Sequence, residues 1–130
     1  MANYLIKNYK ININIDDDNF FQLSCEYGQL EFAKWLFKIG KESNCHININ
    51  RNKDRAFRWS CEYGHLQIVK WLIELGKELK SPINIRALND DAFRLSCNSG
   101  QLQVAKWLCT LYDGYYLVDK NGIIIDWGIY

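Results

Sequence analysis

A spacing of 36 residues runs through most of the chain. The string Ser-Cys-Glu-Tyr-Gly begins at Ser24 and again at Ser60, and the related string Ser-Cys-Asn-Ser-Gly begins at Ser96. A Lys-Trp-Leu triplet follows each string at the same distance. A fixed period of this size predicts a stack of repeated structural units, because each unit buries its apolar face only against its neighbours. Units one, two and three are residues 12–47, 48–83 and 84–119.

Each unit has the pattern of two helices joined at a glycine. In unit two we expect the first helix over about 55–63, ended by Gly64 in a left-handed conformation. The second helix should start near Leu66, and it is so apolar that neighbouring units must cover most of its surface. The tryptophans of the Lys-Trp-Leu triplets should pack in this core. We expect Gly76 to end the second helix, as Gly40 does in unit one. An aspartate before each first helix is predicted to be its N-cap: Asp18, Asp54 and Asp90.

A segment rich in asparagine and isoleucine precedes each first helix. In unit two it reads Asn-Ile-Asn-Arg-Asn-Lys over residues 48–53, and its copies are residues 12–17 and 84–89. Alternating isoleucines favour a short extended segment, and asparagines suit a turn. We therefore expect these three segments, called the arms, to project from the stack.

This pattern resembles the ankyrin repeat. The family's core reads roughly Leu-His-x-Ala-Ala-x-x-Gly-His-Leu and then Val-Val-Lys-x-Leu-Leu. Residues 57–73 read Phe-Arg-Trp-Ser-Cys-Glu-Tyr-Gly-His-Leu-Gln-Ile-Val-Lys-Trp-Leu-Ile, and the likeness extends over residues 12–119. The family's Thr-Pro helix start is missing, and its histidine is replaced by Gln22, Arg58 and Arg94. These departures put the family's usual Thr/His hydrogen bonds in doubt, but not the fold.

The period and the Lys-Trp-Leu triplets are also similar to long-period ankyrin repeats of giant, mimivirus-like DNA viruses. The family's usual period is about 33 residues, and the extra residues here fall near 77–81. The resemblance implies an all-α, ankyrin-type solenoid of three helix-turn-helix repeats with an irregular cap at each end. The likeness to viral proteins implies a viral protein that acts inside a host cell.

The two ends of the chain depart from the repeat. Residues 1–11 look like the remnant of a second helix and should cap unit one. Residues 115–130 overlap the end of unit three, and Asn121-Gly122 between two apolar runs predicts a β-hairpin. The hairpin segment is rich in large apolar residues. We expect it to form either a tight cap or a surface for homodimer formation.

The five cysteines and two histidines suggest no catalytic, cofactor or metal site. Cys25, Cys61 and Cys97 occupy equivalent positions, and packed helices lie roughly 8–10 Å apart, too far for a disulfide. No further cysteine or histidine pair has zinc-ligand spacing. Nucleophile motifs and phosphate-binding loops are missing too, so we expect no enzyme activity. An odd number of cysteines without a secretion signal favours an intracellular, cytoplasmic location, which is the host cytoplasm if the protein is viral.

The charges favour a protein partner. Sixteen basic residues against fifteen acidic ones leave a net charge of +1, which argues against a strongly basic nucleic-acid surface. Arg51, Lys53 and Arg58 cluster in unit two, whereas unit one has Asp16 and Asp17 in the equivalent region. A groove that binds nucleic acid needs positive charge along its whole length, because the phosphate backbone is negative throughout. No apolar run is long enough to span a membrane, and nothing points to a small-molecule substrate.

The ankyrin resemblance implies a non-catalytic module for protein–protein interaction. Binding would use the tips of the arms and the exposed side of the first helices. Two alternatives remain, a structural remnant of a larger repeat family that binds little, and a nucleic-acid binder. The expected protein-binding residues are Ile15, Asp16, Asp17, Glu26, Tyr27, Arg51, Asn52, Lys53, Arg58, Glu62, Tyr63, Ala87, Leu88, Asn89, Asn98 and Ser99.

Overall fold

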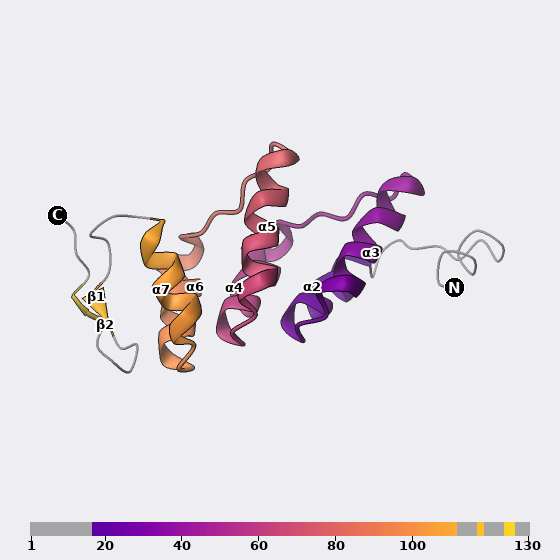
Figure 1. The fold of residues 1–130 in the computed structure, drawn as a ribbon. Coiled ribbons are helices and arrows are strands. Elements are labelled where there is room, and N and C mark those ends of the chain that lie inside the picture. Colours follow the sequence, from indigo (N-terminus) through magenta and orange to yellow (C-terminus); the bar gives the residue numbers. More distant parts are fainter. Residues whose placement is uncertain (1–16, 112–116, 119–123, 127–130) are drawn as a thin grey trace.

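Three helical pairs stand side by side in the computed structural model, which describes residues 17–111, 117–118 and 124–126. The helices of these residues are α2 (Asp17–Glu26), α3 (Leu30–Glu42), α4 (Arg51–Glu62), α5 (Leu66–Glu78), α6 (Ala87–Asn98) and α7 (Leu102–Thr110). The first helices of the units, α2, α4 and α6, pack on one another in one layer, and α3, α5 and α7 form the second layer (Figure 1). The predicted all-α stack of three helix-turn-helix units is confirmed.

The first helices end at glycines that have a left-handed backbone. The φ angles of Gly28, Gly64 and Gly100 are 74°, 78° and 73°. In unit two, the amide of His65 donates to the carbonyl of Ser60 over 2.9 Å. That bond closes a turn in which glycine avoids a Cβ clash. The predicted role of Gly64 is therefore confirmed.

The second helices do not end at their glycines, so that prediction was wrong. Helix α5 continues through Gly76 to Glu78, and Lys80 takes the left-handed conformation with a φ of 57°. A glycine is needed at position 76 for another reason, because the segment that follows the helix packs directly against it. A Cβ added there would lie 3.0 Å from the carbonyl oxygen of Ser81. Helix α3 passes Gly40 in the same way and ends at residue 42.

The arms of units two and three are turns rather than extended segments. Residues 17–111 contain no strand. Instead, residues 52–54 and 88–90 each form a left-handed turn, with every φ between 55° and 62°. The right-handed part of α4 consequently begins at Arg55, as the sequence predicted. Isoleucines at the base of these arms point into the core, and Ile49 and Ile83 are buried.

The left-handed turns give the predicted capping aspartates a different role. Asp54 is buried, and its carboxylate accepts from Asn50 Nδ2 over 2.7 Å and from the amide of Asn84 over 2.9 Å. An N-cap residue normally has an extended backbone, which the left-handed φ of Asp54 and Asp90 excludes. Asp54 therefore joins two arms instead of capping its own helix. The side chain of Asp18 lies outside the described residues.

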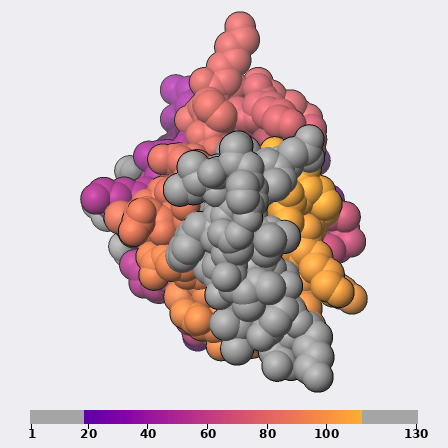
Figure 2. Space-filling view, turned by 90° about the vertical axis from the view of Figure 1, so that its left-hand side faces the viewer, coloured from indigo at the N-terminus to yellow at the C-terminus, as the bar shows by residue number. Residues whose placement is uncertain are grey.

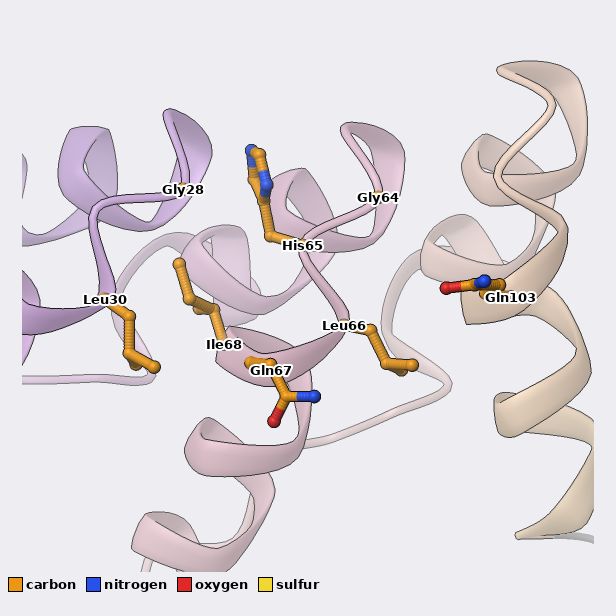
Figure 3. Close-up of a pocket in the computed structure, with 8 residues that line it drawn as sticks. All are labelled: Gly28, Leu30, Gly64, His65, Leu66, Gln67, Ile68 and Gln103. Atoms are coloured by element: carbon orange, nitrogen blue, oxygen red, sulfur yellow. The ribbon is translucent and has the colours of Figure 1, made fainter.

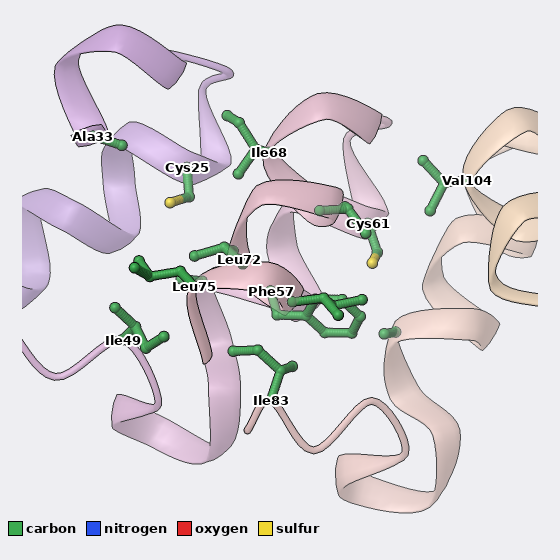
Figure 4. Close-up of a cluster of buried hydrophobic side chains, with 14 of the residues drawn as sticks. Cys25, Ala33, Ile49, Phe57, Cys61, Ile68, Leu72, Leu75, Ile83 and Val104 are labelled. Carbon is green, nitrogen blue, oxygen red and sulfur yellow. The ribbon is translucent and has the colours of Figure 1, made fainter. Parts of the chain in front are cut away.

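One continuous apolar core runs through all three units. The phenylalanines at equivalent positions, Phe21, Phe57 and Phe93, are at most 2% exposed. Figure 4 shows Phe57 among side chains from neighbouring units, with Cys25 on one side and Val104 on the other. Because this core passes from unit to unit, each repeat depends on its neighbours for its stability.

The tryptophans of the Lys-Trp-Leu triplets pack on the edge of this core. Trp35, Trp71 and Trp107 are half-buried and contact the buried cluster. The ring of Trp71 lies 5.9 Å from that of Phe21, so unit two packs an aromatic side chain against unit one. The predicted core packing is confirmed, although each of the three tryptophans stays partly exposed.

Two short strands lie beyond α7. β1 (Leu117–Val118) and β2 (Ile124–Asp126) pair in antiparallel fashion, with Leu117 opposite Asp126. Viewed from this end, unit three lies in front of units one and two, which show around its edges (Figure 2). The turn of the predicted hairpin and all of residues 1–16 lie outside the described residues. Both caps therefore stay predictions.

Candidate protein-binding surface

The predicted binding residues lie at the two ends of the first helices. The arms precede these helices, and the Glu-Tyr pairs at residues 26–27 and 62–63 end α2 and α4. The right-handed part of α4, residues 55–62, separates the two groups by about 12 Å at 1.5 Å per residue. The predicted site is therefore two surfaces, one at each end of the first-helix layer.

The surface at the carboxyl ends of α2 and α4 contains a hollow of about 300 Å³. Glu26, Tyr27, Tyr63 and His65 line it, and we call it the tyrosine notch. Tyr27 is 68% exposed and Tyr63 is 50% exposed. Two aromatic rings thus face solvent beside a carboxylate, an arrangement that can stack on and attract a ligand.

His65 forms the wall of this notch and joins two units. Its Nε2 lies 2.8 Å from the carbonyl oxygen of Glu26. Figure 3 shows its ring standing between the turns at Gly28 and Gly64. A Cβ added to Gly28 would lie 2.6 Å from the imidazole, so only glycine lets the ring pack there. The hydrogen bond of His65 to the carbonyl of Glu26 therefore joins unit two to unit one.

A second hollow, of about 360 Å³, lies on the other side of His65. Its lining comes from the glycine turns and from the starts of the second helices (Figure 3). Leu66 and Ile68 give it apolar walls, and Gln67 and Gln103 add amide groups. None of its lining residues is an aspartate, glutamate, lysine or arginine, so it offers a ligand less charge than the notch does.

Negative charge gathers at the tyrosine notch. The carboxylate of Glu62 raises the pKa of Tyr63, and desolvation, Glu26 and Tyr27 raise it further. Asn98 and Ser99 replace this Glu-Tyr pair in unit three, where the chain has neither the charge nor the ring. The acidic and aromatic character of the surface is therefore confined to units one and two.

Arg58 is held inside the fold, although the sequence placed it on the binding surface. Its side chain is 11% exposed and pairs with Asp91 of unit three over 2.9 Å. Its Nε and Nη2 donate to the carbonyls of Lys53 and Asn52, each over 2.9 Å. Arg94 binds the carbonyls of the next left-handed turn in the same way. These arginines stabilise the arms from within.

The other arm residues differ in their exposure. Ala87 is 6% exposed and has no surface to offer a partner. Ile15 and Asp16 lie outside the described residues, as does the side chain of Asp17. The predicted binding residues of the arms that are exposed are Arg51, Asn52, Lys53, Leu88 and Asn89.

The buried thiols have little reactivity. Burial raises the pKa of Cys25 to about 12 and that of Cys61 well above its ordinary value, so little thiolate forms at either residue. Within the described ranges, no group of three or more histidine, cysteine, aspartate or glutamate side chains could hold a metal ion. What this surface offers is charge, hydrogen bonds and aromatic contact. None of the helices in the same part of the chain is long and apolar enough to cross a membrane.

Comparison with known proteins identifies the repeat. The family model described as ankyrin repeats, in three copies, matches residues 1–83 and also residues 21–122. Together the two matches cover every unit of the stack. Searches of curated proteins and of solved structures found no match.

Proposed function

The chain belongs to the ankyrin-repeat family, whose members are generally protein–protein interaction modules, and from this premise we propose that it binds a protein partner through its arms and first-helix ends. One observation carries the proposal. Most buried positions repeat the same residue types from unit to unit, whereas the tips of the arms differ in every unit and the helix-end Glu-Tyr pair is replaced in unit three. A module that keeps its packing constant and varies its recognition surface has this distribution. The family is typically non-catalytic, and we propose the same for this chain.

The proposed surface carries both signs of charge. Arg51 and Lys53 are exposed and basic, whereas Asp16 and Asp17 occupy the equivalent arm of unit one. A protein with complementary charges in the reverse order would associate faster and in one orientation. The structural remnant is the runner-up, and nucleic-acid binding is the weaker alternative because the basic cluster is confined to one arm. We leave Arg58 and Ala87 out of the proposed surface, since one is bonded and the other is buried.

Charge reversal in the arm of unit two tests this proposal. Host-cell proteins retained by the immobilised chain would be identified by mass spectrometry, and the association rate of each would then be measured. The double variant Arg51→Glu and Lys53→Glu should associate more slowly, with a nearly unchanged melting temperature. The control is Lys34→Glu with Lys38→Glu, which makes the same charge change on exposed positions of α3. It should associate at the wild-type rate.

Two results would count against the arms. Surface charge pairs are screened by salt, so association through the arms should weaken as salt is raised to about 0.5 M. Binding that survives this salt and is indifferent to both charge reversals does not use the arms. If no protein is retained at all, the structural-remnant alternative explains the chain better.

A viral origin and a place in the host cytoplasm are finer parts of the same proposal. The 36-residue period and the three Lys-Trp-Leu triplets support them through their likeness to repeats of giant DNA viruses. Fluorescence microscopy of infected host cells, with an antibody to this chain, is the direct test. A signal in the cytoplasm is expected, and its absence from infected cells would refute this part.

A second copy of the chain is a further candidate partner, through residues 115–130. These residues hold Tyr115, Tyr116, Trp127 and Tyr130 among many apolar side chains. If they form a dimer surface, their deletion should turn a dimer into a stable monomer in sedimentation equilibrium. If they form a cap, deletion should instead lower the melting temperature sharply. A truncated chain with unchanged stability and unchanged mass would refute both.

A further inference from the structure

The tyrosine notch has the chemistry of a site for a cationic side chain. Tyr27 and Tyr63 present exposed rings at the rim of the hollow, and His65 forms its wall. Glu26 lies in the lining, and Glu62 acts on the Tyr63 hydroxyl from beside it. Aromatic faces attract cations through their quadrupole. Carboxylates next to those faces add a direct ion pair.

Other ligand classes fit less well. An anionic group would meet the negative charges of Glu26 and Glu62 without a fixed cation among the four lining residues. A purely apolar side chain would remove water from the Glu26 carboxylate and return no hydrogen bond, which costs free energy. A cation avoids both penalties. The volume of about 300 Å³ is enough for the end of one long side chain.

We propose that the tyrosine notch receives an arginine side chain of the protein partner. The inference rests on the proposed function and names the partner chemistry of one of its two surfaces. A guanidinium is planar, so it stacks on a tyrosine face while its edge donates two hydrogen bonds to a carboxylate. A lysine ammonium makes the ion pair but lacks the flat face.

The junction between units two and three lacks part of the arrangement found at the tyrosine notch. At the junction of units two and three, Glu62 and Tyr63 stand where Glu26 and Tyr27 stand at the first junction, but Asn98, Ser99 and Gln101 replace Glu62, Tyr63 and His65. One carboxylate, one of the two rings and the imidazole are therefore lost there. A single arginine position on the partner, opposite units one and two, is therefore expected.

A small probe tests the notch without the partner. The full chain labelled with ¹⁵N would be titrated with N-acetyl-arginine amide, and amide shifts followed by NMR. The citrulline analogue has the same shape without the charge, and the lysine analogue has the charge without the plane. Shifts should concentrate at residues 26–28 and 62–65, and the apparent Kd for citrulline should be at least about tenfold weaker. Lysine should fall between the two.

Two substitutions copied from unit three provide the variants. Tyr63→Ser and Glu62→Asn each replace an exposed or half-exposed side chain, so the fold should tolerate them. Both should weaken arginine binding at least about fivefold, since each removes a stacking face or a charge. Glu78→Asn, an exposed acidic position at the end of α5, is the control and should bind as wild type does. Melting temperatures of all three would be compared first.

The outcomes separate this inference from the proposed function. Equal affinity for the arginine and citrulline probes would overturn the proposal that the notch binds arginine. So would amide shifts centred on the arms, or wild-type affinity in both variants. Any of these leaves the chain a protein-binding module. If the notch binds the arginine probe but the chain retains no protein, the proposed function is overturned, whereas the affinity of the notch for a guanidinium group is supported.

Discussion

Arg58 and Arg94 each close a left-handed turn by donating hydrogen bonds to its carbonyl groups. Arg58 also forms a largely buried ion pair with Asp91, which joins unit two to unit three. A buried pair costs solvation when it forms, but the loss of one partner leaves the other charge unpaired. Arg58 is therefore expected to stabilise the fold rather than to serve as a surface charge.

Substitution of Arg58 should be costly. We expect Arg58→Met to lower the free energy of unfolding by about 2–3 kcal/mol, since it frees two carbonyls and leaves Asp91 with a weaker partner. Urea denaturation followed by circular dichroism would measure the change. Lys38→Met, at an exposed position of α3, is the control and should change it by less than about 0.5 kcal/mol. Equal midpoints for the two variants would show that the buried pair contributes nothing.

Three glycines with the same backbone conformation have different surroundings. A Cβ at Gly100 would meet no atom within 4 Å, whereas a Cβ at Gly28 would strike the His65 ring. Gly100→Ala should therefore lose only about 1 kcal/mol, the cost of alanine in the left-handed region. Gly28→Ala should lose about 2–3 kcal/mol, because the imidazole must also move. Thermal unfolding of both variants checks this, and equal losses would contradict the packing of His65.

The left-handed turns of the arms are strained elements. Lys53 and Leu88 carry side chains at φ angles of 56° and 55°, a region that costs ordinary residues roughly 1–2 kcal/mol each. The turns persist because Arg58 and Arg94 donate hydrogen bonds to their carbonyl groups. Strain of this kind concentrates where a surface must keep one shape for recognition.

Relief of that strain should stabilise the chain. We expect Lys53→Gly to raise the free energy of unfolding by about 1 kcal/mol, because glycine accepts the left-handed region without a Cβ clash. Lys38→Gly, in the right-handed helix α3, should lower it by about 1 kcal/mol. Chemical denaturation compares the two directly. A loss of stability in both variants would mean that residue 53 is not held in a left-handed turn.

The helices were predictable from the sequence, but the left-handed turns were not. Three copies in register placed the end of α4 at Gly64 and the start of α5 at Leu66, because apolar spacing and a turn glycine recur together. Nothing about lysine or leucine indicates a left-handed backbone at residues 53 and 88. The turn depends on hydrogen bonds from a side chain in the following helix, and local propensity does not contain that information.

The candidate surface was predictable in part for the same reason. Tyr27 and Tyr63 were among the residues that the ankyrin resemblance implied for binding, and both do line one hollow. The part played by His65 was missed, because its partner, the carbonyl of Glu26, lies 39 residues away. The equivalent Gln101 packing on Gly64 repeats the arrangement in the next junction. A contact between units can be expected at this position only once the stack is known.

At the scale of the whole molecule, one core holds three units, and the proposed recognition surface is divided between the two ends of the first-helix layer. The arms carry the strained turns and mixed charges, and the helix ends carry the tyrosine notch. The layer of α3, α5 and α7 presents exposed lysines such as Lys34 and Lys38 on a different part of the surface. Binding of a partner through the proposed surface should be weakened by substitutions in the arms and at the first-helix ends. Substitutions of the α3 lysines should leave it unchanged.

Differential capture tests this account most directly. Three immobilised chains would be exposed to the same cell extract: wild type, a recognition-surface variant with Arg51→Glu, Lys53→Glu and Tyr63→Ser, and an α3 variant with Lys34→Glu and Lys38→Glu. Quantitative mass spectrometry would compare the proteins that each retains. We predict that proteins enriched on the wild type are equally enriched on the α3 variant and lost from the recognition-surface variant. Equal retention by all three chains, or loss from the α3 variant alone, would contradict the claim that the arms and first-helix ends bind the partner.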